Sequence, residues 1–132
     1  MIVVYDSLTG QTKRFATRLG LEAVAINEFD FNRDDEILLC TRSHGFGKIP
    51  ETTLNFLKIW HHKVVGVAVS GNRNWGTNYG AAGDKIQEQF NIPLVVKFEG
   101  PGFPEERQTA IDWIDNYLGG EEQWLIQKYL SG

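Results

Sequence analysis

Residues 2–19 read IVVYDSLTGQTKRFATRL, and this stretch decides the fold. The run from Ile2 to Tyr5 is short, apolar and rich in β-branched residues, which is typical of a buried strand. A polar break follows, and from Thr12 to Leu19 apolar residues recur at the spacing of a helix. The stretch therefore predicts a strand, a loop and a helix in immediate succession.

Strands and helices are predicted to alternate along the rest of the chain. Such an alternation predicts a mostly parallel sheet with helices on both faces. The residues NEFDFNRDD at 27–35 are too few for a helical crossover, but an extended chain of this length reaches roughly 30 Å, so we retain the parallel arrangement. Further strands are expected at 23–26, 36–41, 64–69 and 93–98, and further helices at 50–60, 81–90 and 105–118.

The composition limits the class of protein. The 132 residues, of which 42% are hydrophobic and 23% charged, fit a single domain with a real core. The net charge of -4 argues against a nucleic-acid partner, since nucleic-acid binders carry a basic excess. A lone cysteine, Cys40, can form neither an internal disulfide nor a thiolate metal cluster. No apolar run reaches the length of a signal peptide or a membrane span, so we expect a cytoplasmic protein with no membrane partner.

The first of three unusual loops, DSLTGQT at 6–12, lies where the first strand ends. It offers hydroxyls and a glycine directly before a helix, whose amino end favours an anion. No lysine follows the glycine and no G-x-G-x-x-G is present, so this is neither a Walker A loop nor a dinucleotide fingerprint. The loop is compatible with a phosphate monoester held by hydrogen bonds, and equally with plain capping of the helix by serine or threonine.

Two more loops leave the same edge of the predicted sheet, TRSHGFGKIP at 41–50 and SGNRNWGTNYG at 70–80. Ligands of open α/β sheets bind at this edge. The glycines allow the main chain to approach a flat ring, while the asparagines, Trp75 and Tyr79 offer hydrogen bonds and aromatic cover. The alternative is a pair of glycine-rich turns with surface aromatics. We assign no catalytic base or nucleophile and no metal site, because His44 has no ligand cluster at metal spacing.

Three segments carry a family resemblance: SLTGQTKRF at 7–15, GFGKIP at 45–50 and SGNRNWGTNYGAAGDKI at 70–86. They resemble the NrdI family, flavodoxin-like proteins associated with class Ib ribonucleotide reductase, and the similarity runs from Met1 to about Phe98. The resemblance implies an α/β fold, a flavodoxin-like three-layer sandwich with a five-stranded, mostly parallel sheet in the order 2-1-3-4-5. Residues 1–118 would form the FMN-binding domain and residues 119–132 a C-terminal appendage, which could be a short helix.

The resemblance also implies which residues contact FMN. The family often has Asn where Gln11 stands and TYTTGFG where this chain reads TRSHGFG at 41–47, so the second loop is more basic here. Contacts to the phosphate are implied in the first loop at Ser7, Leu8, Thr9, Gly10, Gln11 and Thr12. Contacts to the isoalloxazine are implied at Ser43, His44, Gly45, Phe46 and Gly47, and at Ser70, Gly71, Asn72, Asn74, Trp75, Gly76 and Tyr79.

In family terms the chain is a flavoprotein activase or electron-transfer protein rather than a conventional enzyme. The resemblance implies that reduced FMN, supplied with electrons by an unidentified reductant, would react with molecular oxygen and deliver superoxide to the small, radical-bearing subunit of the reductase. That subunit then assembles its dimanganese–tyrosyl radical cofactor. The nearest alternative is an ordinary flavodoxin that carries electrons to another enzyme. A response-regulator receiver is disfavoured because Asp6 has no adjacent acidic partner, and a scaffold without flavin is disfavoured by Trp75 and the intact glycines.

Positive charge around the ring is a further expectation. Arg42, His44, Lys48 and Arg73 fall on the two loops predicted to flank it, and positive charge there would stabilise an anionic reduced flavin. Asp6 is expected to be structural.

Overall fold

The computed structural model describes the backbone of residues 1–131 and the side chains of residues 1–120. Strands and helices alternate as predicted, and three short 3-10 turns lie at Ile26–Glu28, His61–Lys63 and Arg73–Asn78. The strands are β1 (Ile2–Tyr5), β2 (Ala23–Ala25), β3 (Ile37–Arg42), β4 (Val64–Ser70) and β5 (Leu94–Phe98). The helices are α1 (Gln11–Ala16), α2 (Glu51–Trp60), α3 (Ala81–Phe90) and α4 (Pro104–Ser131).

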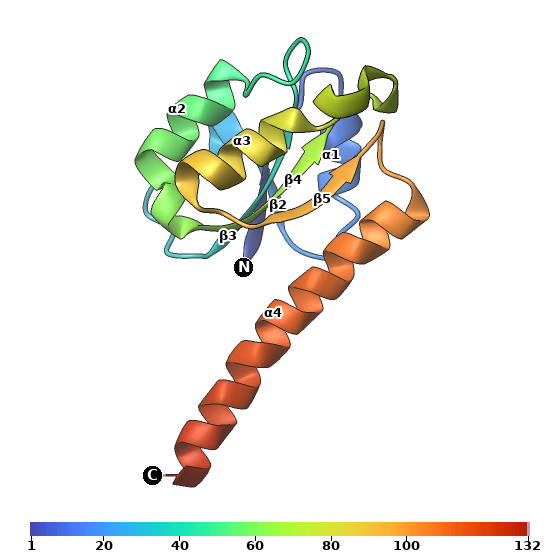
Figure 1. Ribbon diagram of the computed structural model, residues 1–132. Coiled ribbons are helices and arrows are strands. Elements are labelled where there is room, and N and C mark those ends of the chain that lie inside the picture. Colours follow the sequence, from blue (N-terminus) through green and yellow to red (C-terminus); the bar gives the residue numbers. More distant parts are fainter. Residues whose placement is uncertain (132) are drawn as a thin grey trace.

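The five strands form one sheet in the order β2-β1-β3-β4-β5, and every neighbouring pair is parallel. This confirms the predicted flavodoxin-like fold. The register places Tyr5 beside Cys40 and Arg42 beside Ser70. The carboxyl ends of β1, β3 and β4 therefore meet along one edge, which is the upper edge in Figure 1.

Alternate residues of each strand face two separate hydrophobic cores, which gives the three layers seen in Figure 1. Val4 and Leu39 belong to the core beneath α2 and α3, together with Ile86. Val3 and Leu38 belong to the core beneath α1 and α4. Burial on both faces is why the strands read as continuous apolar runs in the sequence.

No α-helix connects β2 to β3, as the short link predicted, and only the 3-10 turn at Ile26–Glu28 lies between them. The link instead covers that part of the sheet with Phe29, which is buried. The Phe29 ring packs edge-on against Phe56 at 5.4 Å and Trp60 at 5.7 Å between centroids. These aromatic side chains thus cover the part of the sheet that a crossover helix would otherwise cover, and β2 and β3 keep the same direction.

Two helix ends differ from expectation. Helix α1 ends at Ala16 rather than Leu19, and the Thr17 hydroxyl there donates to the Lys13 carbonyl at 2.9 Å. Helix α4 does not end at Leu118 but continues through Gly119 and Gly120 to Ser131, past the end of the sheet (Figure 1). Two glycines cost a helix only about 1 kcal/mol each, too little to stop a long one. That residues 119–132 form a separate appendage stays a prediction, and Gly132 lies outside the described residues.

In the described part of the chain no helix combines the length and apolar character needed to cross a bilayer.

Candidate functional site

Three loops lie together at the carboxyl edge of the sheet: loop 1 (residues 6–10) after β1, loop 2 (43–50) after β3 and loop 3 (71–80) after β4. Their roots are joined at Ser70, the last residue of β4. The Ser43 N–H donates to the Ser70 carbonyl at 3.1 Å, and the hydroxyls of Thr12 and Ser70 lie 3.5 Å apart. The structure therefore brings together the three segments that the sequence singled out.

Loop 1 is organised around the hydroxyl of Ser7. Its oxygen accepts hydrogen bonds from the N–H groups of Gly10 at 3.1 Å and Lys13 at 3.2 Å, so it occupies part of the amino end of α1. Gly10 has φ +94°, a left-handed conformation that suits glycine. Leu8, Thr9 and Gln11 are exposed, whereas Thr12 is buried. The N-cap of α1 is Gly10, which has no side chain to cap with, so the Ser7 hydroxyl satisfies the Lys13 N–H from three residues before this cap. Phosphate contacts in this loop stay a prediction.

Loop 2 is a tight hairpin. Two backbone hydrogen bonds of 2.8 Å join His44 and Lys48 and leave Gly45, Phe46 and Gly47 at the tip. Both glycines have positive φ, +55° and +105°. Phe46 is 74% exposed, and the ammonium of Lys85 donates to the Gly47 carbonyl at 2.9 Å. Lys85 therefore anchors the tip of loop 2 to α3. Lys85 lies within the motif at 70–86, but the sequence alone did not predict this contact.

Loop 3 closes on itself and touches loop 2. A Cβ on Gly71 would lie 2.7 Å from the Gly80 nitrogen, so only glycine allows the two ends of the loop to approach this closely. The Asn72 side chain accepts a hydrogen bond from the Asn74 N–H at 2.9 Å. The rings of Phe46 and Trp75 meet edge-on at 6.0 Å between centroids. Loops 2 and 3 are therefore in contact at their aromatic residues, as a site shared between them requires.

Several features of these loops fit a ligand with a polar edge and a flat face. The hydroxyl oxygen of Ser43, at the start of loop 2, is out of contact with solvent and has no hydrogen-bond partner among the described residues. Leaving such a group unpaired costs about 1–3 kcal/mol, which a ligand with polar atoms would recover. At Gly10, Gly45 and Gly76 a Cβ would meet nothing within 4 Å, so the main chain there is open to a neighbour.

Below loops 1 and 2 lies a buried polar network that the sequence did not predict. Asp6 is buried, and its carboxylate accepts hydrogen bonds from the hydroxyls of Thr52 and Thr53 in the first turn of α2. The Nε atom of Arg42 lies 3.7 Å from the same carboxylate. Asp6 is therefore structural, as expected, but a pair of threonines in a helix gives no sequence signal that they will bind it.

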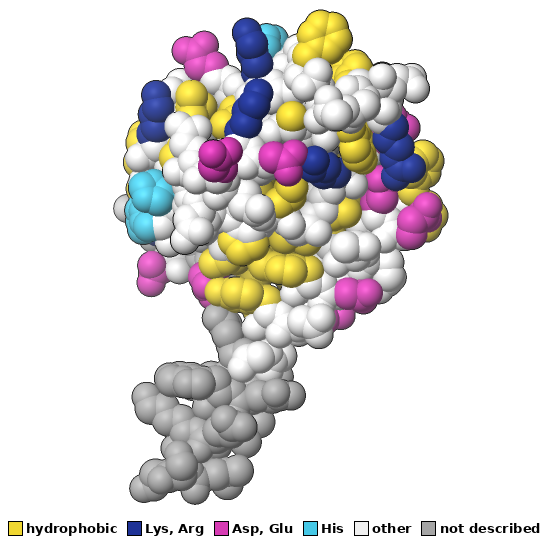
Figure 2. Space-filling view, in the orientation of Figure 1, with side chains coloured by type: hydrophobic (Ala, Val, Ile, Leu, Met, Phe, Trp, Pro, Cys, Tyr) yellow, Lys and Arg dark blue, Asp and Glu magenta, His cyan; other side chains and the backbone are white. Residues whose placement is uncertain are grey.

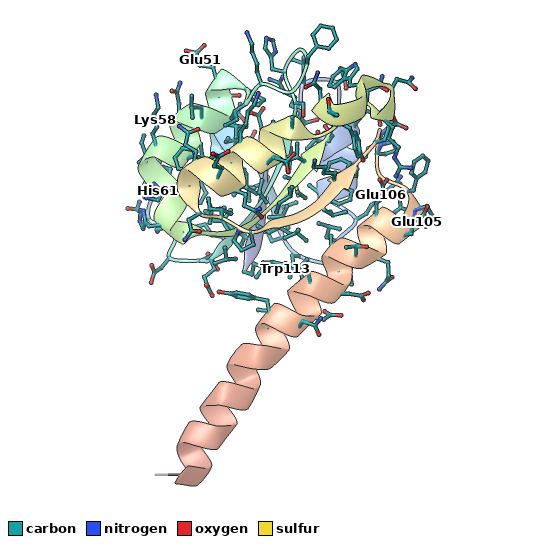
Figure 3. All side chains as sticks on the ribbon, in the orientation of Figure 1. Glu51, Lys58, His61, Glu105, Glu106 and Trp113 are labelled. Atoms are coloured by element: carbon teal, nitrogen blue, oxygen red, sulfur yellow. The ribbon has the colours of Figure 1, made fainter. Side chains whose placement is uncertain are left out.

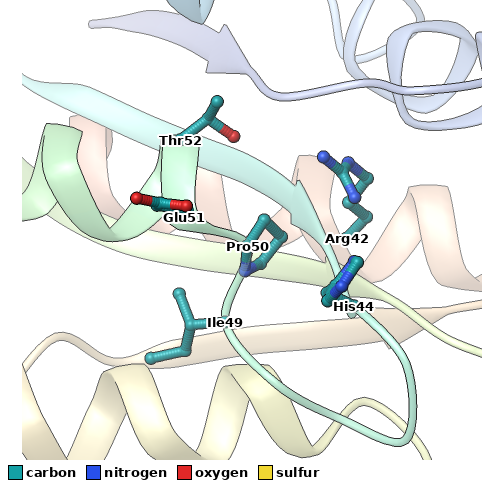
Figure 4. A pocket seen from close by; sticks show the side chains of 6 residues that line it. All are labelled: Arg42, His44, Ile49, Pro50, Glu51 and Thr52. Carbon is teal, nitrogen blue, oxygen red and sulfur yellow. The ribbon is translucent and has the colours of Figure 1, made fainter.

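Two cavities flank Arg42. One, of about 310 Å³, is lined by Arg42, His44 and residues 49–52 and is drawn in Figure 4. The other, of about 300 Å³, lies between loop 1 and the end of β2 and also includes Arg42 and Thr52. Neither cavity is lined by loop 3, so both lie to one side of the contact between loops 2 and 3.

Two of the four positive charges expected around loops 2 and 3 have carboxylate partners, while their effect on a bound flavin stays a prediction. Arg42 is paired with Asp6, and the guanidinium of Arg73 lies 2.8 Å from the carboxylate of Glu106, on the far side of loop 3 from loop 2. His44 and Lys48 are exposed on loop 2. Figure 2 shows Lys, Arg and His side chains beside hydrophobic ones at the upper edge, over these loops. Arg42 is the last residue of β3 and not part of loop 2, and the sequence could not supply the carboxylate partners of Arg42 and Arg73.

Comparisons with known proteins agree with this architecture. The family model described as NrdI flavodoxin-like matches residues 3–111. Two curated relatives, SPbeta prophage-derived protein NrdI of Bacillus subtilis (strain 168) and phage protein nrdI of Bacillus phage SPbeta, are each 42% identical over 116 residues, or 85% of this chain and 89% of the relative. A solved short-chain flavodoxin associated with a PDU bacterial microcompartment has a TM-score of 0.70 at 21% identity, covering 91% of this chain and 99% of the flavodoxin. The structural likeness supports the fold alone.

Proposed function

Because the chain belongs to the NrdI flavodoxin-like family, whose cofactor is FMN and which is linked to ribonucleotide reductase, we propose that it serves the small subunit of the class Ib reductase. When bound, FMN would supply one-electron chemistry, and the proposed oxidant is superoxide made from oxygen with its electrons. The small subunit would use that oxidant to assemble its dimanganese–tyrosyl radical cofactor. The electrons would come from a reductant that the chain's own residues do not identify.

Each of the three loops would contact a different part of FMN. Loop 1 would hold the phosphate through the hydroxyl of Thr9 and the N–H groups of Gln11 and Thr12 at the start of α1, since the Gly10 N–H already donates to Ser7. Loops 2 and 3 would hold the ring, with main-chain groups around Gly45 on one side and Trp75 on the other. The single observation that carries this assignment is the contact between Phe46 and Trp75, which makes one site of two loops far apart in the chain.

Exposed apolar side chains around these loops support a site that meets a protein partner. Leu8 on loop 1 is 73% exposed and Phe46 on loop 2 is 74% exposed. Large apolar side chains at such exposure, next to a redox site, would exclude water when a partner surface covers them. The chain would then pass its oxidant to the small subunit with little loss to solvent.

The test is a reconstitution with purified components. The protein loaded with FMN is reduced without oxygen, mixed with the manganese-loaded small subunit and then exposed to air, and the tyrosyl radical is quantified by electron paramagnetic resonance. We expect the radical with loaded protein and none with the FMN-free protein or with free reduced FMN. Absence of the radical, together with rapid electron transfer to an unrelated acceptor, would favour an ordinary flavodoxin instead.

A further inference from the structure

Arg73 turns away from loop 2 and binds the segment that follows β5. Its guanidinium lies 2.8 Å from a carboxylate oxygen of Glu106, and its backbone N–H donates to the Glu99 carboxylate at 2.8 Å. The guanidinium carbon lies 5.1 Å from the centroid of the Phe103 ring and 5.9 Å from that of the Tyr79 ring. Arg73 therefore joins loop 3 to the 99–106 segment through charge, hydrogen bonds and ring contacts.

The carboxylate of Glu106 is buried and already oriented toward Arg73. It lies in the first turn of α4, near the end of β5 (Figure 3), and its side chain is only 6% exposed. One carboxylate oxygen accepts the N–H of Phe103 at 2.7 Å, and the other accepts Arg73. A buried carboxylate that loses its cation is left with an uncompensated charge, so the pair favours the arrangement in which its two segments stay together.

The position of the pair matters for the predicted site. Arg73 stands between Asn72 and Asn74 and against Tyr79, all of them predicted to contact the ring. The root of loop 3 is held separately, because the Gly71 N–H donates to the Phe98 carbonyl at 2.9 Å. The outer part of loop 3 needs a contact of its own to hold its conformation. Among the described residues of that part, Arg73 forms an ion pair with another segment of the chain.

We propose that Arg73 and Glu106 form a clasp that positions loop 3 for FMN, and that both are positioning residues of the cofactor site. This inference rests on the proposed function of loops 1 to 3. Without the clasp the outer loop samples other conformations, and FMN must then order it on binding, which lowers the apparent affinity. The paired charges leave little net field, so the clasp acts through geometry.

Neutralising each partner separately distinguishes geometry from charge. Arg73→Gln removes a positive charge and Glu106→Gln removes a negative one, so long-range attraction for the FMN phosphate would change in opposite directions. If the clasp positions loop 3, both variants instead bind FMN about tenfold more weakly, and the double variant is no weaker than the worse single one. Arg73→Lys keeps the charge and should retain most of the affinity.

The measurement is the dissociation constant for FMN, from quenching of flavin fluorescence. Glu22→Gln is the matched control, since Glu22 forms an ion pair with Arg33 at 2.6 Å, on residues that flank the amino ends of β2 and β3. We expect this control to bind like the wild type. If circular dichroism shows that Glu106→Gln does not fold, the FMN affinities of Arg73→Gln and Arg73→Lys are compared instead. Both of these variants should fold, because the Arg73 side chain is 54% exposed.

The outcomes separate the two proposals. Unchanged affinity in Arg73→Gln, or opposite changes in the two single variants, overturns the clasp while FMN binding by the wild type stands. A wild type that binds no FMN overturns the proposed function and the clasp with it.

Discussion

The carboxylate of Asp6 and the hydroxyl of Thr53 are hydrogen-bonded at 2.7 Å, and both are buried where β1 ends and α2 begins. The same hydroxyl lies 2.6 Å from that of Thr41 on β3. Three elements therefore meet in one polar network directly beneath loops 1 and 2. A buried acceptor with these donors fixes where the two loops leave the sheet.

Asp6→Ala should lower the free energy of unfolding by about 3 kcal/mol, because it leaves the buried Thr53 hydroxyl without its acceptor and Arg42 without its nearby carboxylate. The measurement is urea unfolding of the FMN-free protein. Asp34→Ala is the control, since the Asp34 side chain is fully exposed and should cost less than about 0.5 kcal/mol. Equal losses in the two variants would show that the network contributes nothing.

Gly47→Ala should disturb loop 2 more than Gly45→Ala. Both residues have positive φ, so each alanine strains the backbone by about 1–2 kcal/mol. At Gly47 the new Cβ would also lie 2.7 Å from the Ala81 Cβ, whereas at Gly45 it meets nothing within 4 Å. We expect Gly47→Ala to be less stable in thermal unfolding, and a larger loss for Gly45→Ala would contradict this packing.

Thr9→Val should separate phosphate binding from ring binding. If loop 1 holds the phosphate, the variant loses affinity for FMN by about three- to tenfold, the value of one hydrogen bond, and keeps its affinity for riboflavin, which has no phosphate. Thr17→Val is the control, because the Thr17 hydroxyl bonds the Lys13 carbonyl at the other end of α1. A parallel loss for FMN and riboflavin would place the phosphate elsewhere.

Cys40 should make the protein less stable in alkali. Burial raises the pKa of its thiol above the ordinary value of 9.0, so the thiol stays protonated in the folded chain. In the unfolded chain it ionises as the pH rises through about 9, which favours unfolding; below that pH it has no effect.

In Cys40→Ala this source of alkaline instability is absent. The variant is less stable than the wild type at neutral pH because of the lost volume, and the difference should narrow by up to about 1.4 kcal/mol for each pH unit above about pH 9. Urea unfolding at several pH values measures it. A constant difference would mean that the thiol ionises as readily in the folded protein.

The fold could be predicted from the sequence because its signals are local. The apolar run at Ile2–Tyr5 and the helical spacing after it decide the first strand and helix, and the same alternation recurs to Phe98. The three loops were identified for the same reason, since glycine and asparagine mark them directly. Family resemblance supplied the strand order, which periodicity alone does not determine.

What the sequence could not supply were the long-range partners of polar side chains. Arg73 pairs with Glu106, 33 positions along the chain, and Lys85 reaches the Gly47 carbonyl, 38 positions back. Such pairs depend on how loops pack once the sheet has formed. The end of α4 was missed for a different reason, because Gly119 and Gly120 resemble a stop signal but have no positive φ.

The most direct test of a flavin site built from loops 1, 2 and 3 is an equilibrium titration of the purified protein with FMN, followed by flavin fluorescence and visible absorbance. We expect saturable quenching with one FMN per chain and a shifted flavin absorption band. Fluorescence that stays that of free FMN at every protein concentration would contradict the site, and with it the redox function proposed for this chain.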